Sequence, residues 1–375
     1  MQRVVIAAFG AMLLAGVAAA PLSAAAQDPR PAQDARPAQD ARPAKAAKAT
    51  AWKTPRNAFG QPDLAGTWTN ATLTPLMRRP QFRDQLNYTE DQAREMEANA
   101  EREVEEGNED TDPDAPAEHR AETTNVRPEF AAAGGDVGGY NRGWLDPGSR
   151  VMRVNGEPRT SLITTPNGMP PARKAGAPAP PRFGGEAFDS YEARSLGERC
   201  IMSFGRNAGP PMFPNGFYNN NYRIVQTADS VVIEVEMNHD LRIVRLGGQH
   251  RTDGVRAYMG DSIGRWEGDT LVVETVNLPQ AQHFMGSWEK LKVIERFTRV
   301  GKDRLHYAFT VEDPDLWDKP WGGEYEFSPM DGEIYEYACH EGNYALPGIL
   351  AGARVEEEEK AKAAAAKPGA PGAQP

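Results

Sequence analysis

The sequence of 375 residues lacks a surplus of positive charge. It carries 42 Lys and Arg against 53 Asp and Glu, and its formal net charge is −11. Nucleic-acid binding depends on clustered positive side chains, so we expect no nucleic-acid partner. Beyond its N-terminal stretch the chain also lacks an apolar run of about 18 residues, which is roughly the minimum for a spanning helix. No transmembrane segment is therefore expected in the mature protein.

Signature patterns of metal-binding proteins are absent as well. The sequence contains no HExxH motif, no paired CxxC motif and no Asp/Asn-rich loop of the EF-hand type. We therefore expect no cofactor and assign no metal ligands. One alternative stays open, because metal ligands in a barrel come from different strands: His239, His283 and His340 could assemble a divalent metal site with a carboxylate.

The N-terminus predicts export. Arg3 is followed by an Ala-rich apolar stretch over residues 4–20 and by small residues up to Ala26, which together indicate a signal peptide over residues 1–26. We expect a periplasmic or secreted protein. The chain has only two cysteines, Cys200 and Cys339, and in that compartment a disulfide between them is the default expectation. Two buried free thiols are the alternative.

Composition divides the rest of the chain into three parts. Residues 27–50 repeat a Pro/Ala-rich pattern and predict a disordered linker, and residues 351–375 form a low-complexity tail. Residues 52–350 are expected to fold as a single β-rich domain with a long irregular N-terminal part. One surface helix is predicted where Thr89 and Gln92 form a capping box ahead of a thin apolar stripe.

From Asn221 onward, alternating apolar and polar residues indicate strands. Residues 231–243 predict one strand whose inner face includes His239, and residues 265–278, 290–313 and 322–338 predict three hairpins. Roughly eight strands at this spacing are typical of a mainly β, antiparallel up-and-down meander that forms a closed or nearly closed barrel. The triplet Gly66-Thr67-Trp68 resembles the Gly-x-Trp of lipocalins, in which the tryptophan closes one barrel end. This resemblance favours a lipocalin-like barrel.

Several sequence blocks occur together along the putative domain. They include "PRTSLIT" (158–164), "YNNNY" (218–222), "EMNHD" (236–240) and "YACHEGNY" (337–344). Their combination resembles a large family of exported bacterial proteins to which no reaction is assigned. The resemblance implies export and one shared domain, and it implies no catalytic residues.

Two of these blocks gather residues suited to acid–base chemistry. A histidine beside carboxylates can move protons near neutral pH, and an arginine can stabilise negative charge. Strand parity places Cys339 and His340 on opposite faces, which argues against a Cys–His nucleophile pair and leaves the histidine available. An ordinary strand end and a core histidine are the structural alternatives. The candidate catalytic residues are Glu236, His239, Asp240, Arg242, His340 and Glu341.

Aromatic and amide side chains in the predicted loops suit a sugar, although the same residues also fill barrel ends. The candidate residues for binding a small molecule or glycan are Arg159, Asn220, Tyr222, His283 and Tyr344. The sequence favours an exported enzyme, a lyase or hydrolase that acts on a carbohydrate or a similar polyhydroxylated compound. A lipocalin-like protein that binds a small molecule without catalysis and a structural envelope protein are the alternatives.

Overall fold

The computed structural model describes residues 52–107, 146–181, 188–216 and 218–366. The predicted signal peptide and the Pro/Ala-rich linker lie outside the described residues. So do residues 108–145 of the predicted irregular region and the last residues of the predicted tail, 367–375.

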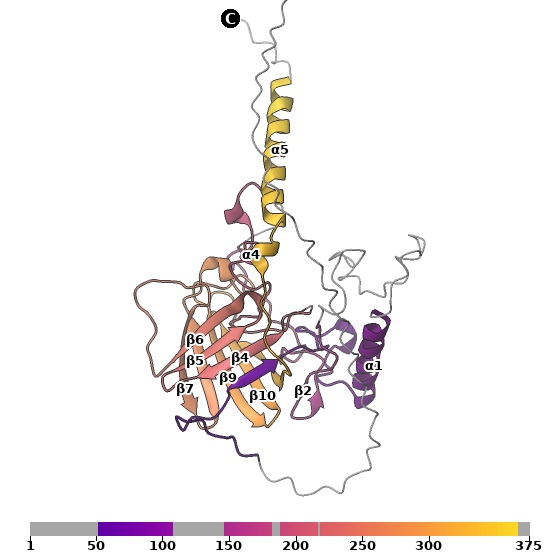
Figure 1. Cartoon of the computed structure of the whole chain (residues 1–375), viewed down its shortest axis with the longest axis vertical. Coiled ribbons are helices and arrows are strands. Elements are labelled where there is room, and N and C mark those ends of the chain that lie inside the picture. Colours follow the sequence, from indigo (N-terminus) through magenta and orange to yellow (C-terminus); the bar gives the residue numbers. More distant parts are fainter. Residues whose placement is uncertain (1–51, 108–145, 182–187, 217, 367–375) are drawn as a thin grey trace, which may run out of the picture. The chain divides into compact units, whose positions relative to one another are not determined.

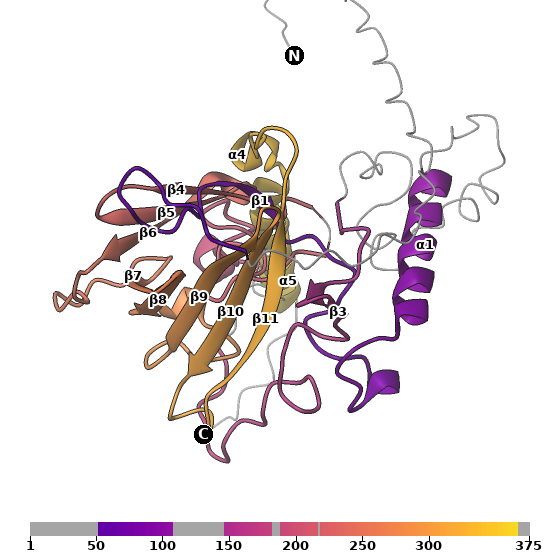
Figure 2. The same ribbon diagram turned by 90° about the horizontal axis from the view of Figure 1, so that it is seen from below.

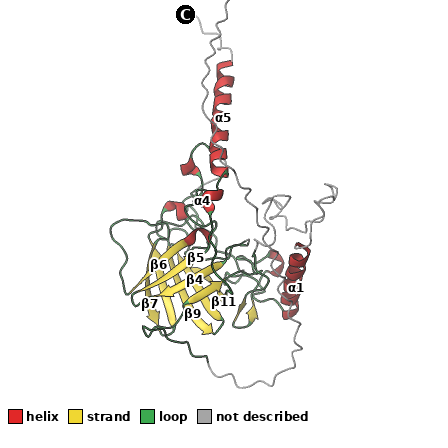
Figure 3. Ribbon diagram, in the orientation of Figure 1, coloured by secondary structure: helices red, strands yellow, loops and turns green. Residues whose placement is uncertain are grey.

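The alternating segments form strands that close into a barrel, as the sequence predicted (Figures 1 and 3). In the described chain nine strands follow the order β1-β11-β10-β9-β8-β7-β6-β5-β4 around it. The strands are β1 (Gly66–Thr69), β4 (Asn221–Gln226), β5 (Ser230–Val235), β6 (Asp240–Leu246), β7 (Asp261–Glu267), β8 (Thr270–Val276), β9 (Lys292–Gly301), β10 (Arg304–Glu312) and β11 (Trp321–Pro329). In Figure 2 strands β9, β10 and β11 lie side by side, in agreement with their pairing. The prediction of a mainly β, lipocalin-like barrel is confirmed.

One strand pair departs from the antiparallel meander. Strands β6 and β7 are parallel and pair over only three positions, from Val244↔Ser262 to Leu246↔Gly264. A parallel pair needs a crossover connection, and residues 247–260 provide it. This connection contains His250.

The short strand β1 completes the barrel between β4 and β11, far from its neighbours in sequence. Trp68 in this strand is buried, and its indole N–H donates to the carbonyl of Leu64 at 3.1 Å. The guanidinium of Arg299 lies over the indole ring, 5.4 Å from its centroid. Trp68 therefore packs inside the barrel from its first strand.

The remaining elements are short strands and helices. A separate two-stranded sheet pairs β2 (Arg153–Val154) with β3 (Glu157–Pro158). The helices are α1 (Glu90–Gly107), α4 (Cys339–Gly342) and α5 (Ala345–Ala366), and the 3₁₀ turns are η1 (Pro80–Phe82), η3 (Tyr191–Ala193), η4 (Met237–His239) and η5 (Gln280–Gln282). None of the helices in the described ranges combines the length and the apolar character that crossing a membrane requires.

Helix α1 begins as its capping box predicts. The N–H of Thr89 donates to Gln92 Oε1 at 2.9 Å, and the N–H of Gln92 donates to Thr89 Oγ1 at 3.2 Å. Ala93, in the apolar stripe, is fully buried, whereas Val104 near the helix end is exposed. The helix thus lies on the surface, attached along the side that holds Ala93 and Ala100.

The predicted continuous strand over residues 231–243 is wrong. Strand β5 ends at Val235, and η4 turns the chain through positive φ at Asn238 (58°) and His239 (51°) before β6 begins at Asp240. Because side chains alternate along a strand, this turn exchanges the faces of everything after it. Arg242 points into the barrel, while Leu241 and Ile243, predicted to be inside, are exposed.

The predicted third hairpin is also wrong. Strand β11 ends at Pro329, and no strand follows it within the described residues. The segment 330–338 has no regular secondary structure, and Cys339–Gly342 within the "ACHEGNY" block form the short helix α4 (Figure 3). Parity arguments for Cys339 and His340 as residues of a last strand therefore do not hold.

The core fills the barrel up to its mouth, the end at which β4 and β6 begin. The interior cluster includes inward residues from every barrel strand except β7, for example Val235, Phe297 and Phe327. The loop over residues 203–213 adds to this cluster, with Met212 and Phe213 buried among the strand residues. The mouth is thus closed by the chain itself.

Candidate functional site

The barrel interior holds a buried ion pair between β6 and β9. Arg242 Nη1 donates to Glu295 Oε1 at 2.9 Å, and Arg242 Nη2 pairs with Glu295 Oε2; the two side chains are 1% and 0% exposed. Further bonds from Arg242 reach Ser262 Oγ at 3.2 Å and Thr275 Oγ1 at 3.0 Å. Tyr307 donates its hydroxyl to Glu295 Oε1 at 2.8 Å. Burial alone would lower the pKa of Arg242, but the charge of Glu295 outweighs it and raises that pKa, so Arg242 stays charged.

A chain of hydroxyl groups continues from this pair towards the mouth. The hydroxyl of Tyr307 accepts the N–H of Met212 at 3.0 Å, and the carbonyl of Met212 accepts the hydroxyl of Tyr325 at 2.9 Å. Asn70 Nδ2 donates to the hydroxyls of Tyr325 and Tyr222, both at 3.2 Å. Burial raises the pKa of all three tyrosines, which therefore stay protonated. We call this chain, together with the ion pair, the inner network.

The two candidate carboxylates beside η4 hold neighbouring segments onto the mouth. Asp240 Oδ2 accepts the N–H of Ser203 at 2.7 Å and its hydroxyl at 2.6 Å. Glu236 accepts Asn221 Nδ2 at 2.7 Å and the N–H of Tyr335 at 3.3 Å. Burial raises the pKa of Asp240, although the bonds from Ser203 oppose this. In this arrangement both carboxylates anchor the chain.

The two candidate histidines lie at the surface near the disulfide. His239 is exposed, and its Nε2 accepts the N–H of Tyr337 at 3.3 Å. His340 is exposed on α4, next to Cys339. Cys339 is bonded to Cys200 with a Cα–Cα distance of 5.6 Å, which confirms the predicted disulfide. Neither histidine faces the barrel interior, contrary to the parity argument.

Two of the candidate binding residues and Glu341 lie on the outside of the molecule. Arg159 pairs with Glu324 on the outer face of β11, and the same carboxylate lies 3.0 Å from His306 Nε2. Tyr344 is 83% exposed directly after α4, and Glu341 is exposed within that helix. Arg159 therefore fastens the chain that covers this face.

The other three candidate binding residues lie near the mouth in different surroundings. Tyr222 belongs to the inner network. Asn220 is fully buried, and its Nδ2 donates to the carbonyls of Asp146 and Asn215, both at 2.8 Å. Burial, followed by the charge of Arg206, lowers the pKa of His283. The candidates do not converge on one another as a set.

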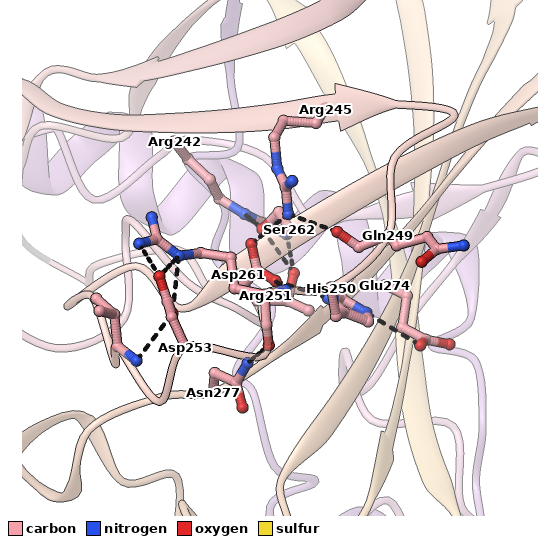
Figure 4. A network of polar contacts seen from close by, with 12 residues as sticks. Arg242, Arg245, Gln249, His250, Arg251, Asp253, Asp261, Ser262, Glu274 and Asn277 are labelled. Carbon is pink, nitrogen blue, oxygen red and sulfur yellow. Dashed lines mark hydrogen bonds and ion pairs between the residues drawn. The ribbon is translucent and has the colours of Figure 1, made fainter.

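A second polar network lies on the outer face of the same barrel wall, where Figure 4 shows it beside Arg242 and Ser262. Nδ1 of His250 lies 3.0 Å from Asp261 Oδ2, and its Nε2 lies 3.2 Å from Glu274 Oε1. Arg245 Nη2 donates to Asp261 Oδ1 at 2.6 Å, and the N–H of Arg251 donates to Asp261 Oδ2 at 2.8 Å. These five residues form the outer network.

The sheet positions the two carboxylates of the outer network. Asp261 begins β7 and Glu274 lies in β8, with its neighbour Thr275 facing the barrel interior. Burial alone would raise the pKa of Asp261, but hydrogen bonds from Arg251 and His250 and the charge of Arg245 outweigh it and lower that pKa. Asp261 is thus ionised at neutral pH and orients the imidazole through Nδ1.

The outer network is partly open to solvent. The side chain of His250 is 22% exposed and that of Glu274 is 30% exposed, whereas Asp261 is 7% exposed. A proton on the His250–Glu274 side can therefore exchange with a molecule outside, while Asp261 stays covered. This division matches the needs of an acid–base pair with a buried orienting group.

A Gly-x-Ser-x-Gly pattern, Gly260-Asp261-Ser262-Ile263-Gly264, coincides with the start of β7. This pattern marks a hydrolase nucleophile when it forms a turn between a strand and a helix. Here it continues as a strand, and Ser262 Oγ is buried between Arg242 and Thr275, 2.8 Å from Thr275 Oγ1. Because Ser262 and Asp261 point to opposite faces, His250 and Ser262 form no catalytic pair.

Metal chemistry finds no support in the described residues, where no group of three His, Cys, Asp or Glu side chains is arranged to hold a metal ion. His239, His283 and His340 therefore do not form the metal site that the sequence left open. The outer network offers one nitrogen on either side of the ring to a carboxylate, which suits proton sharing better than metal coordination.

Sequence reasoning missed His250. Its loop, "GGQHRTDG" (247–254), combines glycines with charged residues between two strands and thus has the composition of an ordinary turn. Positions 250, 261 and 274 meet only because β6 and β7 run parallel and the crossover folds back over β7 and β8. The signal for this site would have been a histidine in a connection between two parallel strands. The sequence predicted only antiparallel strands, so the connection gave no reason to consider His250.

No family model matches the chain, and no curated protein matches it significantly. The resemblance to exported bacterial proteins thus stays a prediction, and the chemistry of the site is argued from its geometry.

Proposed function

We propose that the protein is an exported enzyme in which His250, Asp261 and Glu274 perform general acid–base catalysis. Its reaction class is a lyase or hydrolase acting on a carbohydrate or a similar polyhydroxylated compound. The acid–base chemistry is of the kind that the sequence suggested, but its residues belong to the outer network and do not include His239 or His340.

The observation that carries the proposal is the placement of one imidazole between two carboxylates. With Asp261 ionised, Nδ1 of His250 donates to it, and Nε2 then faces Glu274 at 3.2 Å. A proton on Nε2 would lie within hydrogen-bond reach of Glu274 Oε1, on the partly exposed side of the ring. A general acid needs a proton that is exposed in this way beside a hydrogen-bond partner.

The roles of the residues follow from this geometry. The His250–Glu274 pair donates its proton to the leaving oxygen of the substrate. The deprotonated pair then takes a proton from water in hydrolysis, or from carbon in elimination, which returns it to its starting protonation state. Arg245 keeps Asp261 ionised, and Asp261 keeps the ring oriented. Neither step requires the buried inner network.

The test is a screen of the purified protein against polysaccharides and aryl glycosides, with reducing ends and the ultraviolet absorbance of unsaturated products as readouts. His250→Gln and Glu274→Gln should each lower the rate by about 10²-fold or more, the usual contribution of an acid–base group. His306→Gln is the matched control, since His306 also lies on the outer face 3.0 Å from a carboxylate, Glu324. Full activity of His250→Gln on an identified substrate would refute the assignment.

A second candidate function is non-catalytic binding of a small molecule at the barrel mouth. Two buried amide oxygens, Asn70 Oδ1 and Asn207 Oδ1, have no hydrogen-bond partner among the described residues. Asn70 and Asn207 both contact the hydroxyl of Tyr222, so the two oxygens belong to one region. A hydroxylated ligand could donate to them. Calorimetry that detects binding in the His250→Gln variant without any turnover by the wild type would favour this function.

A further inference from the structure

The segment 335–344 lies against the turn between β5 and β6 and against residues 198–200, as a strap with exposed aromatic side chains. Tyr335 is 69% exposed and Tyr344 is 83% exposed, both unusually high for a large ring in a folded protein. Between them the ring of Tyr337 stacks with Tyr218, at 6.2 Å between centroids and 22° between planes. Three tyrosines of the strap thus lie in this region together with Tyr218, which comes shortly before β4.

The strap is held in place by its backbone. The N–H groups of Tyr335 and Tyr337 donate to Glu236 and His239, and Asn343 Nδ2 donates to the carbonyl of Glu198 at 2.9 Å. The disulfide of Cys339 anchors its middle. The side chains of Tyr335 and Tyr344 take no part in these anchors. Rings on a fixed backbone lose little conformational entropy when a ligand stacks on them.

Charge restricts what the strap can bind. Residues 331–344 contain four carboxylates, at Asp331, Glu333, Glu336 and Glu341, and no Lys or Arg. Nucleic acids, anionic lipids and uronate polymers are repelled by such a segment. Neutral sugars are not, because their C–H faces stack on aromatic rings and their hydroxyls donate to carboxylates.

We infer that the strap is a binding surface for a neutral polysaccharide, with Tyr335 and Tyr344 as the stacking rings and Glu336 and Glu341 as acceptors for sugar hydroxyls. This surface is separate from the outer network. It holds a polymer whether or not His250 performs chemistry.

The experiment is native gel electrophoresis of the full chain in gels that contain a soluble neutral β-glucan or glucomannan, with polygalacturonate as the anionic counterpart. Wild type should be retarded by at least one neutral polymer and by polygalacturonate less. Tyr335→Ala with Tyr344→Ala should weaken the apparent affinity by about tenfold or more, since each lost stacking contact is worth roughly a kcal/mol. The double Tyr→Phe variant should retain binding because its rings remain.

Two controls separate this inference from the proposed enzyme and from misfolding. Phe59→Ala removes another exposed ring, 52% exposed, outside the strap and should leave retardation unchanged. His250→Gln should bind as the wild type does even if its catalysis is lost. The inference is overturned if no neutral polymer retards the wild type, if the double Ala variant is retarded equally, or if polygalacturonate is preferred.

Discussion

The inner and outer networks occupy the two faces of one barrel wall, and they differ in how far their polar groups are exposed to solvent. Adjacent residues divide between them: Ser262 and Thr275 face inward, whereas Asp261 and Glu274 face outward. Figure 4 shows Ser262, Asp261 and Glu274 of this group. The inner ion pair is buried and meets hydroxyl partners on β7, β8 and β10. The outer imidazole is partly exposed and lies between two carboxylates, those of Asp261 and Glu274. Titratable groups at neighbouring positions of one wall can therefore differ completely in their access to solvent.

The largest expected effect breaks the inner network. Arg242→Met leaves Glu295 buried without a counter-charge, which should cost about 3–5 kcal/mol of unfolding free energy, measured by chemical denaturation. The double variant with Glu295→Leu should recover most of that loss, because both charges are then gone. Arg265→Gln, which breaks an exposed pair with Glu267, should cost less than about 1 kcal/mol. A loss of that small size for Arg242→Met would show that the inner pair is not what holds the wall together.

Alkaline pH should weaken the inner network next. The folded pKa values of Tyr222, Tyr307 and Tyr325 are raised above the ordinary 10.0, so the unfolded state loses these protons first. Their contribution to stability is complete below pH 10 and is lost as the pH rises through the folded values. Arg206 acts in the opposite direction, because burial lowers its pKa from 12.5 to about 10.

Three tyrosines should outweigh one arginine, so the free energy of unfolding should fall above pH 10. Phenolate absorbance recorded alongside denaturation measures this, and Tyr325→Phe should make the fall less steep. An unfolding free energy that rises between pH 10 and 11 would contradict the assignment.

Asp261→Asn should have an intermediate effect on the outer network. Asp261 accepts bonds from Arg245, His250 and Arg251, and weakening them should cost about 1–3 kcal/mol. Because the pKa of Asp261 is lowered, its contribution is present above the ordinary 3.8 and is lost only as the pH falls through the folded value. Amide exchange in residues 247–260 should accelerate in the variant at pH 7. Asp253→Asn, at an exposed pair, should leave exchange there nearly unchanged.

The smallest expected effect on stability belongs to His250→Gln. Its side chain is partly exposed and glutamine can keep one hydrogen bond, so thermal unfolding should shift by no more than about 1 kcal/mol. The same variant should lose acid–base activity, as described above. If His250→Gln instead lost much stability and kept full turnover, the outer network would have a structural role and no catalytic one.

Local patterns predicted the elements that depend on neighbouring residues. The capping box at Thr89 and Gln92 forms as expected, because its bonds join residues three apart. Alternation over residues 270–276 and 292–312 predicted strands that exist, since side-chain period follows from backbone geometry. The disulfide was predictable from two cysteines in a chain whose N-terminal sequence predicts export, without knowledge of the fold.

The candidate site was predicted less well, and the reason is strand parity. The turn at Asn238 and His239 shifts β6 by the equivalent of one face, which places Arg242 inside and His239 outside. Asn and His are enriched in the left-handed region, so Asn238-His239 was compatible with a turn, but the unbroken apolar alternation on either side favoured a continuous strand. That turn moved His239 and Arg242 to faces other than the predicted ones, whereas His340 and Glu341 were displaced because α4 stands where a last strand was predicted.

The sequence by itself determined which segments become strands, where the surface helix begins and that two cysteines would meet, because these depend on local periodicity, capping and residue count. Only the tertiary structure decided which polar side chains share a face. His250, Asp261 and Glu274 meet through a parallel strand pair and a crossover loop, and the charges of Arg242 and Glu295 meet across the barrel. Such contacts join positions far apart in the chain, and their pairing depends on strand order and register, to which local periodicity is blind.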